Sequence, residues 1–459
     1  MSTKPFIKKY SISNLFGYKN FELSFDDNIK ILIGENGYGK TTVLNSLSFL
    51  LKGEYKNLSR IKFSEIRIEF DDSHNYEFSS NDLKSYVQYL DKQKEGEDGI
   101  ISYINHRLEP SELTQLIKLV YTNKDEVIET IKNNDILNGI PSSIVYQALL
   151  ELSERTNKYK VFTDIATYVN STGYKILYYP TYRRVEVDLK NIMNNISHNT
   201  RRGFRNEQDE LMNDNTIIKF GMSDVEKRRD KICEEIRRSS ISGFAAVSGG
   251  MISKLLDQNF SNTECHNFDI NEIKIVLSRV GENMSQNDKD TILSQISSDP
   301  SLNQQNSYLR YFLDQLLSVY KKQEKYDTAI KQFVKTCNNY LCDKEFSYDE
   351  SAVDLKLHRK NNAIKPENLE LIQLSSGEKQ IVSIFSQLYL EPDKKYIVLF
   401  DEPELSLSIY WQEKLLPDML DSGRCVFMLA VTHSPFIFNN DLKANVAGLK
   451  EFMKNGTEK

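Results

Sequence analysis

Apolar and polar residues alternate in several short runs near the start of the chain. Residues 6–12, 21–25 and 66–70 each place apolar side chains on one face of an extended segment. This spacing predicts strands with one buried face. We therefore expect a first α/β lobe that extends to about residue 78.

Three further runs are apolar throughout. Residues 31–33, 396–400 and 426–431 read Ile-Leu-Ile, Tyr-Ile-Val-Leu-Phe and Val-Phe-Met-Leu-Ala-Val. Continuous apolar runs of this length predict strands that are buried on both faces, as in a parallel sheet. Residues 173–179 predict one more strand, which stops at Pro180 because proline cannot donate a hydrogen bond to a sheet.

Helical spacing dominates the long stretch between these runs. Leu113, Leu116 and Val120 recur at helix spacing inside residues 82–167, and residues 307–340 carry a long apolar stripe. Pro, Gly and Asn interrupt the stretch repeatedly. We therefore expect a compact helical insertion rather than a long coiled-coil arm.

The middle of this insertion contains segments of other composition. Residues 198–216 are polar and predict a mobile segment. Residues 223–226 form a capping box that opens a charged helix. Acidic residues are interleaved with its basic ones, which favours a solvated face over a nucleic-acid contact. Residues 239–250 are rich in Ser, Gly and Ala and predict a loop.

A phosphate-binding pattern lies between a predicted strand and a predicted helix. Residues 34–41 read Gly-Glu-Asn-Gly-Tyr-Gly-Lys-Thr and fit GxxxxGK[ST]. The glycines allow backbone N–H groups to surround an anion, and the helix adds its positive end. Lys40 is expected to reach the β- and γ-phosphates of ATP, and Thr41 to bind Mg²⁺. The expected ATP-binding residues here are Asn36, Gly37, Gly39, Lys40, Thr41 and Thr42.

The two C-terminal apolar runs end in residues suited to phosphoryl transfer. Asp401 and Glu402 follow one run, and His433 follows the other. We expect Asp401 to hold Mg²⁺, Glu402 to orient the attacking water and His433 to sense the γ-phosphate. Taken singly, acidic residues at a strand end are often only solvated, and a lone histidine is often structural. Together with Lys40, the order of the motifs favours catalytic roles for Glu402 and His433.

Residues 374–380, Leu-Ser-Ser-Gly-Glu-Lys-Gln, complete this series of motifs. The order of phosphate loop, LSSGEKQ, strand-Asp-Glu and strand-Thr-His resembles the ABC-type ATPase heads of the SMC, RecF and OLD-like kind. That resemblance implies an α/β P-loop head assembled from N- and C-terminal lobes, with a large helical insertion. Ser408 stands where many such relatives carry His, and its role is left open.

The same resemblance implies that the signature acts between two copies of the chain. Ser375, Ser376, Gly377 and Glu378 would close over the ATP that a second copy holds. The expected assembly is therefore a homo-oligomer, either a dimer or a hexamer built from dimers, and the cofactors are ATP and Mg²⁺. A compact transporter head is excluded, because most of the chain separates Lys40 from the signature.

These motifs divide the chain into five expected segments. They are ATPase lobe I (residues 1–80), a helical insertion (81–170), a strand and arginine loop that return to the head (171–190), a helical interaction domain (191–345) and ATPase lobe II (346–459). Arg183 and Arg184 in the third segment suit a nucleotide pocket, a subunit interface or a structural ion pair.

Composition adds a little information about partners and cellular location. The net charge of −6 argues against an extensive basic surface for nucleic acid, so a DNA partner is not favoured. No apolar stretch approaches the roughly 20 residues of a membrane span, and the N-terminus lacks a signal region. A cytoplasmic protein without a membrane partner is expected. Its five cysteines are then expected to be free thiols.

The tract at residues 178–184, together with residues 374–380 and 401–408, resembles the ATPases of the PARIS anti-phage pairs. The ATPases of the Septu system are the next most similar family. Either resemblance implies a scaffold that senses a phage-encoded trigger protein and controls a separate effector nuclease. Only a short stretch follows His433, so an appended nuclease domain is not expected. The alternative is a RecF-like ATPase of DNA repair.

Overall fold

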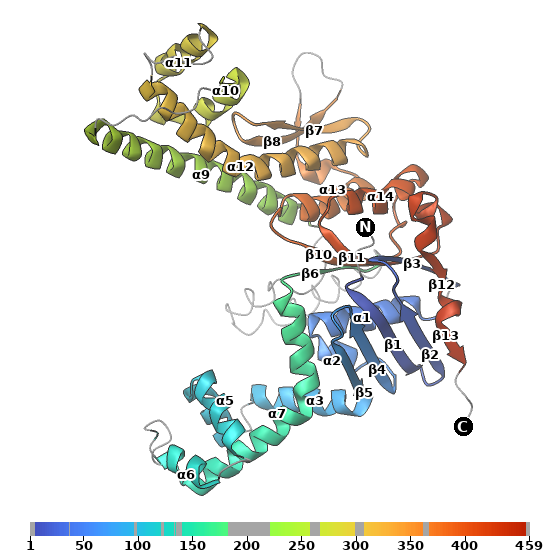
Figure 1. Ribbon diagram of the computed structural model, residues 1–459. Helices are drawn as coiled ribbons and strands as arrows, with labels where there is room; N and C mark the ends of the chain where they lie inside the picture. The colour runs from blue at the N-terminus through green and yellow to red at the C-terminus, as the bar shows by residue number, and fades with distance from the viewer. Residues whose placement is uncertain are drawn as a thin grey trace, which may run out of the picture. The chain divides into compact units, whose positions relative to one another are not determined.

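The computed structural model describes most of the chain and divides it into two compact units (Figure 1). Unit 1 contains Met1–Thr216, Lys395–Leu405 and Val426–Lys459, and unit 2 contains Ile217–Lys394 and Ser406–Cys425. The described residues are 5–35, 37–95, 99–120, 124–132, 134, 140–181, 221–257, 267–298, 307–360 and 367–455.

A parallel sheet in unit 1 interleaves strands from both ends of the chain. Its order is β12-β3-β11-β10-β6. β3 pairs in parallel with β11 on one side and β12 on the other, and β10 pairs in parallel with β6. The strands are β3 (Ile29–Ile33), β6 (Lys175–Tyr179), β10 (Tyr396–Asp401), β11 (Cys425–Thr432) and β12 (Val446–Gly448). The predicted buried strands are confirmed.

A second, antiparallel sheet completes the core of unit 1. Its order is β13-β2-β1-β4-β5. Its strands are β1 (Ile7–Leu15), β2 (Lys19–Ser24), β4 (Glu65–Phe70), β5 (Asn75–Ser79) and β13 (Met453–Asn455). Apolar residues of these strands and of helix α1 (Lys40–Lys52) pack in one core with residues of β3, β10 and β11. The predicted alternation therefore marks the face that meets this core.

Helices extend unit 1 beyond the sheets. They are α2 (Tyr55–Leu58), α3 (Ser80–Glu95), α4 (Gly99–Arg107), α5 (Pro110–Leu119), α6 (Lys124–Lys132) and α7 (Ser142–Ser171). α4 to α7 share a separate apolar core that includes Ile104, Val127 and Leu149. The helical prediction for residues 82–167 is confirmed for the described residues of that range. Short 3₁₀ helices follow β11 and flank β12, at Pro435–Phe438, Asp441–Asn445 and Leu449–Phe452.

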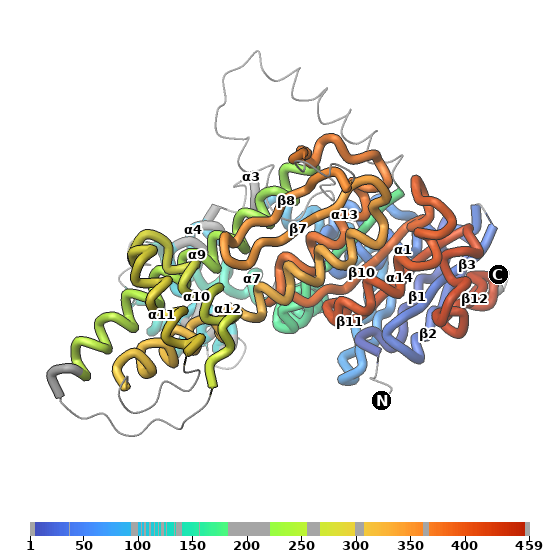
Figure 2. The backbone as a smooth tube through the Cα atoms, turned by 90° about the horizontal axis from the view of Figure 1, so that it is seen from above, coloured from blue at the N-terminus to red at the C-terminus, as the bar shows by residue number. Residues whose placement is uncertain are grey.

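Unit 2 combines a helical arm with a small antiparallel sheet. The arm contains α9 (Met222–Asp257), α10 (Ile270–Arg279), α11 (Gln286–Ser298) and α12 (Ser307–Asn338). α9 and α12 lie side by side (Figure 2). The sheet β7-β8-β9 contains β7 (Lys344–Asp349), β8 (Asp354–Arg359) and β9 (Asn368–Leu369). Helices α13 (Ser376–Tyr389) and α14 (Ile409–Asp421) complete the unit, with 3₁₀ turns at Gly281–Asn283 and Leu371–Gln373.

The loop predicted for residues 239–250 is wrong, because these residues lie inside α9. Tertiary packing stabilises this poor helix-forming sequence: Val247 is buried, and a Cβ atom at Gly243 would lie 2.4 Å from a methyl carbon of Val319 on α12. Gly243 therefore allows α9 to approach α12 closely, and this contact outweighs the low helix propensity of the glycine and serine residues.

The expected α/β class with a helical insertion is confirmed. The proposed boundaries of the five segments remain predictions. The polar segment 198–216, together with Arg183 and Arg184, lies outside the described residues. Among the helices of the described ranges, none combines the length and apolar character that crossing a membrane would require.

Candidate nucleotide-binding site

The predicted phosphate loop joins β3 to the start of α1. Gly37 and Gly39 adopt φ angles of 83° and 98°, a backbone conformation that favours glycine. Lys40 is the first residue of α1. Its Nζ donates hydrogen bonds to the backbone carbonyls of Gly34 at 2.6 Å and Glu35 at 2.9 Å. The lysine is therefore folded back over the loop that it is predicted to serve.

The environment of Lys40 is electrostatically mixed. Burial lowers the pKa of its ammonium group, whereas the carboxylates of Glu402, Asp401 and Glu404 act in the opposite direction. These groups are near enough to influence each other. The arrangement thus brings the phosphate-loop lysine close to the acidic residues at and after the end of β10.

A second lysine supports the same loop from β2. Lys19 is 8% exposed, and its Nζ donates to the carbonyls of Gly37 at 2.9 Å and Tyr38 at 3.3 Å. The rings of Phe16, Tyr18 and Tyr38 surround this ammonium group, with centroids at 5.9, 5.3 and 5.3 Å. Cation–π attraction stabilises such a charge. Sequence patterns do not single out Lys19, because its partners belong to a separate loop.

The Asp401 side chain is hydrogen-bonded to residues of two other segments of the chain. It ends β10, whose residues are all buried, and it is 1% exposed. The Thr41 hydroxyl donates to its Oδ1 at 3.1 Å, and the Thr181 hydroxyl donates to its Oδ2 at 2.8 Å. The two residues predicted to hold Mg²⁺ are therefore adjacent. Thr181 was not expected, and only the parallel pairing of β6 with β10 places it here.

Glu402 occupies a strained position directly after β10. Its φ angle is 53°, which is uncommon for a residue with a side chain, and its N–H donates to the Val431 carbonyl at 2.8 Å. Burial raises the pKa of its carboxyl group, and Asp401 and Glu404 raise it further. His433 and Lys40 shift that pKa in the opposite direction. The proposed water-orienting residue thus lies among the predicted catalytic groups.

Glu404 organises the turn that carries His433. Its Oε2 accepts a hydrogen bond from the Thr432 hydroxyl at 2.7 Å, and its Oε1 accepts from the His433 N–H at 2.8 Å and the Ser434 N–H at 3.2 Å. The His433 side chain is exposed. One carboxylate therefore fixes the backbone after β11 while leaving the imidazole accessible. Its place two residues after Glu402 could have marked Glu404 as a candidate site residue. Its role could not be predicted, because its hydrogen-bond partners lie about 30 residues further along the chain.

The predicted signature forms the N-terminus of α13. Ser375 is the N-cap, and its N–H donates to Oε2 of Glu378 at 2.7 Å in a capping box. The same carboxylate oxygen accepts a hydrogen bond from Lys344 Nζ at 3.0 Å. Glu378 is buried, whereas Ser375 and Ser376 are exposed. The serines therefore lie at the surface, and Glu378 supports the helix start from inside.

Gly377 permits a close backbone approach within unit 2. A Cβ atom at this position would lie 2.6 Å from the Ser406 carbonyl oxygen and 3.2 Å from the Trp411 ring. Any side chain would displace that backbone or the helix start. Ser408 is the exposed N-cap residue of α14, and its side chain makes no capping hydrogen bond.

The predicted residues fall into two groups. Lys40, Thr41, Asp401, Glu402 and His433 belong to unit 1, with Gly37, Gly39 and Thr42 in the loop and first turn of α1. The signature belongs to unit 2. Asn36 lies outside the described residues.

The unit 1 group fits a magnesium nucleotide. An ammonium group and a helix N-terminus suit phosphates, and the Thr41 hydroxyl and Asp401 carboxylate suit a hard cation. A Cβ atom at Gly37 would meet no atom within 4 Å, so the loop is open at that position. The donor set is therefore chemically complete for Mg²⁺ and a nucleoside triphosphate.

Comparison with known proteins assigns the class. The AAA ATPase domain family matches residues 6–438, so the chain belongs to that family. None of the curated proteins matches it. Similar solved structures include an Smc head domain with an extended coiled coil from Pyrococcus furiosus, bound to the C-terminal domain of ScpA. Its identity is 12% and its TM-score 0.34, with 97% of this chain and 93% of that chain covered.

Another similar structure is an Smc head domain with a coiled coil and joint from Pyrococcus yayanosii. Its identity is 12% and its TM-score 0.29, with 97% of this chain and 95% of that chain covered. Likenesses this weak carry no inference about function. The class rests on the family match and on the motifs placed by the fold.

Proposed function

We propose that this AAA-family chain binds and hydrolyses ATP at the site formed by the phosphate loop and the ends of β10 and β11. The observation that carries the proposal is the 3.1 Å hydrogen bond from Thr41 to buried Asp401, which brings together the two residues proposed to hold Mg²⁺. Lys40 would bind the β- and γ-phosphates, and Asp401 and Thr41 would hold Mg²⁺. Bound Mg²⁺ neutralises charge that develops on the phosphate oxygens.

The remaining residues have separate proposed roles. Glu402 would accept a hydrogen bond from the attacking water and align it with the γ-phosphate. His433 would contact that phosphate, with its backbone fixed by Glu404. Ser375, Ser376 and Gly377 would complete the site of a second copy. Support for this last role comes from the motif resemblance and from the exposure of both serines.

Nucleotide binding tests the first role directly. Lys40→Ala should weaken binding of a fluorescent ATP analogue at least ~10-fold, because a charged phosphate contact is lost. Lys84→Ala, which changes an exposed lysine on α3, is the matched control. Equal affinity of both variants and the unchanged protein would reject the assignment of Lys40.

We further propose that this ATPase is the sensor and scaffold of a two-component anti-phage system in the cytoplasm. The support is the tract at residues 178–184 together with the signature and residues 401–408, which resemble AriA of PARIS. The scaffold would hold a separate effector nuclease, such as the Toprim protein AriB that cleaves tRNA. When the scaffold detects a phage-encoded trigger protein, it would release the effector nuclease. The second candidate within this class is PtuA of Septu, whose effector is an HNH nuclease.

Purification with and without the product of the neighbouring gene tests the scaffold role. Light scattering should reveal a large homo-oligomer that captures the second protein, and a gel assay should show its nuclease activity suppressed in the complex. A protein that neither binds nor restrains its neighbour would reject this role. ATP hydrolysis by the purified chain alone would leave the enzymatic proposal standing.

Repair of DNA is the alternative from another class, and it predicts a different response. Duplex DNA should then stimulate ATP hydrolysis, with an affinity that falls steeply as salt rises. An ATPase rate unchanged by DNA at low salt would exclude a RecF-like role.

A further inference from the structure

The small sheet of unit 2 leaves part of β8 without a neighbour. β9 pairs only with Leu357 and His358, through Leu369 and Asn368. Asp354, Leu355 and Lys356 pair with β7 on the other side. Within the described residues, no strand continues β9 along this part of β8. In the described part of the chain, the edge is therefore open for about three residues of strand, which is enough to accept an extended segment.

The direction of the backbone groups can be followed along β8. The Lys360 N–H donates to the Asp343 carbonyl on the β7 side at 3.0 Å. The Arg359 N–H donates to the Glu367 carbonyl on the β9 side at 3.4 Å. Because successive residues of a strand alternate in direction, the N–H and C=O of Leu355 point toward the open edge. One donor and one acceptor are thus in register for another strand.

A groove of about 260 Å³ lies at this edge. Helix α9 contributes one wall, and β8 with β9 contributes the other. The lining residues are Arg229, Asp230, Cys233, Arg237, Val353, Asp354, Leu355, Lys356, Leu357, Asn368 and Leu369. The open backbone edge and the cavity therefore coincide.

The charges along the groove favour an acidic occupant. It is lined by three basic and two acidic residues. Arg229 pairs with Asp230, the next residue of α9, and Lys356 pairs with Asp354, two residues earlier on β8. Arg237 donates to the Val353 carbonyl at 2.7 Å and has no carboxylate partner among the described residues. One positive charge is therefore left at the rim of the groove.

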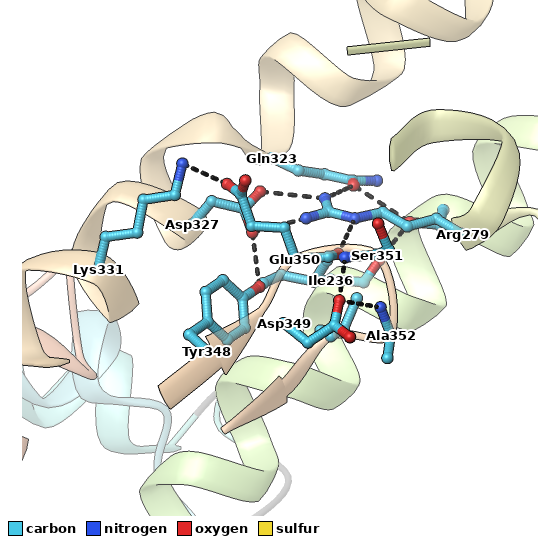
Figure 3. A network of polar contacts seen from close by, with 12 residues as sticks. Ile236, Arg279, Gln323, Asp327, Lys331, Tyr348, Asp349, Glu350, Ser351 and Ala352 are labelled. Atoms are coloured by element: carbon cyan, nitrogen blue, oxygen red, sulfur yellow. Dashed lines mark hydrogen bonds and ion pairs between the residues drawn. The ribbon is translucent and has the colours of Figure 1, made fainter. Parts of the chain in front are cut away.

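The edge is held in place by a buried polar network (Figure 3). Arg279 forms a bidentate ion pair with Asp327, at 3.0 and 2.7 Å, and both side chains are 2% exposed. Arg279 also donates to the Glu350 carbonyl at 2.9 Å, and Tyr348 donates to Asp327 at 2.6 Å. The β7–β8 turn is thereby fixed to α10 and α12. A preformed edge lowers the entropy cost of binding a strand.

We propose that this groove binds an extended acidic segment of a separate polypeptide, which adds to the sheet as a strand beside β8. Main-chain hydrogen bonds to Leu355 would give affinity, and a carboxylate facing Arg237 would give selectivity. β9 leads through a single 3₁₀ turn into the signature, and Lys344 of β7 binds Glu378. Occupation of the groove would therefore act on the start of α13.

The probe is a fluorescein-labelled seven-residue peptide that alternates valine and glutamate, and the matched probe carries lysine instead of glutamate. Fluorescence anisotropy with the full-length protein should show about tenfold tighter binding of the glutamate peptide. Arg237→Glu should invert this preference, a gain of lysine-peptide binding that unfolding cannot produce. Arg238→Glu, an equal charge change one residue outside the groove lining, should preserve it.

Hydrogen exchange then locates the bound peptide. The amide of Leu355 should become protected when the glutamate peptide is added. The proposal is overturned if neither peptide binds at about 1 mM, if Arg238→Glu inverts the preference as Arg237→Glu does, or if protection appears only away from β8. These measurements need no ATP, so their failure leaves the proposed ATPase activity untouched.

Discussion

Glu402 has an uncommon backbone conformation, and its carboxyl group lies close to the other site residues. If it aligns the attacking water, Glu402→Gln should still bind ATP but hydrolyse it at least ~100-fold more slowly, because the amide cannot accept the proton. Steady-state ATPase assays and nucleotide binding on the same sample measure both effects. Glu324→Gln, on the exposed face of α12, is the control. Full turnover by Glu402→Gln would contradict the assignment.

The same carboxyl group predicts a dependence of stability on pH. Its pKa in the folded protein is raised above the usual 4.5. Its favourable contribution is therefore present below pH 4.5 and lost as the pH rises through the folded value. Glu402→Gln removes the ionised group, so its Tm should exceed that of the unchanged protein at pH 7. This difference should shrink as the pH falls toward 4.5, and a constant difference would show that burial of charge is not the cause.

Thr181 contributes one hydroxyl to Asp401, and valine removes that hydroxyl without changing the shape. Thr181→Val should raise the Mg²⁺ concentration for half-maximal ATPase activity about 10-fold, because groups that orient a metal ligand typically matter at this level. Thr163→Val, which loses a hydroxyl bonded to the Lys160 carbonyl within α7, is the control. An unchanged Mg²⁺ requirement in Thr181→Val would limit Thr181 to a structural role.

The sequence predicts the residues of the unit 1 group. It does not predict the residues whose hydrogen bonds fix the positions of that group. Lys40, Thr41, Asp401 and Glu402 stand in local motifs whose chemistry is readable. Thr181, Lys19 and Glu404 act through partners that other elements supply. Their contribution depends on how separate segments pair or pack in the fold, which no local pattern specifies.

At the scale of elements, α9 shows how packing overrides propensity. Gly243→Ala should destabilise unit 2 by about 1–3 kcal/mol, because the new methyl group overlaps Val319. Gly249→Ala is the matched variant, since a Cβ atom there would meet nothing within 4 Å. It should be neutral or stabilise α9 by up to ~1 kcal/mol. Urea unfolding followed by circular dichroism compares them, and equal effects would exclude the close approach as the reason for Gly243.

The misassigned residues 239–250 show a limit of reading elements from composition. Gly and Ser favour loops locally, and the two alanines of this run are not enough to predict a helix. The helix becomes favourable only when α12 places Val319 against Gly243. By contrast, residues 307–340 carry their own apolar stripe, and α12 ends two residues before the predicted limit.

For the whole molecule, the proposed pairing of sites between copies predicts complementation. Lys40→Ala and Ser376→Arg should each abolish ATPase activity in a homo-oligomer. In an equimolar mixture, mixed pairs would contain one intact site, and activity should return to about a quarter of the unchanged protein. Two affinity tags confirm that the subunits have exchanged. If activity does not recover after exchange, the phosphate loop and the signature act within the same copy of the chain.

The position of β3 also constrains how the protein is made. This strand, β3 (Ile29–Ile33), lies between β11 (Cys425–Thr432) and β12 (Val446–Gly448), and both neighbours are synthesised long after it. At bacterial-like elongation rates of 5–20 residues per second, the nascent strand waits roughly 20–80 s for its neighbours. During this time the apolar segment before the phosphate loop is unpaired. Ribosome-bound chains should therefore need chaperone protection until β11 and β12 have been synthesised and can pair with β3.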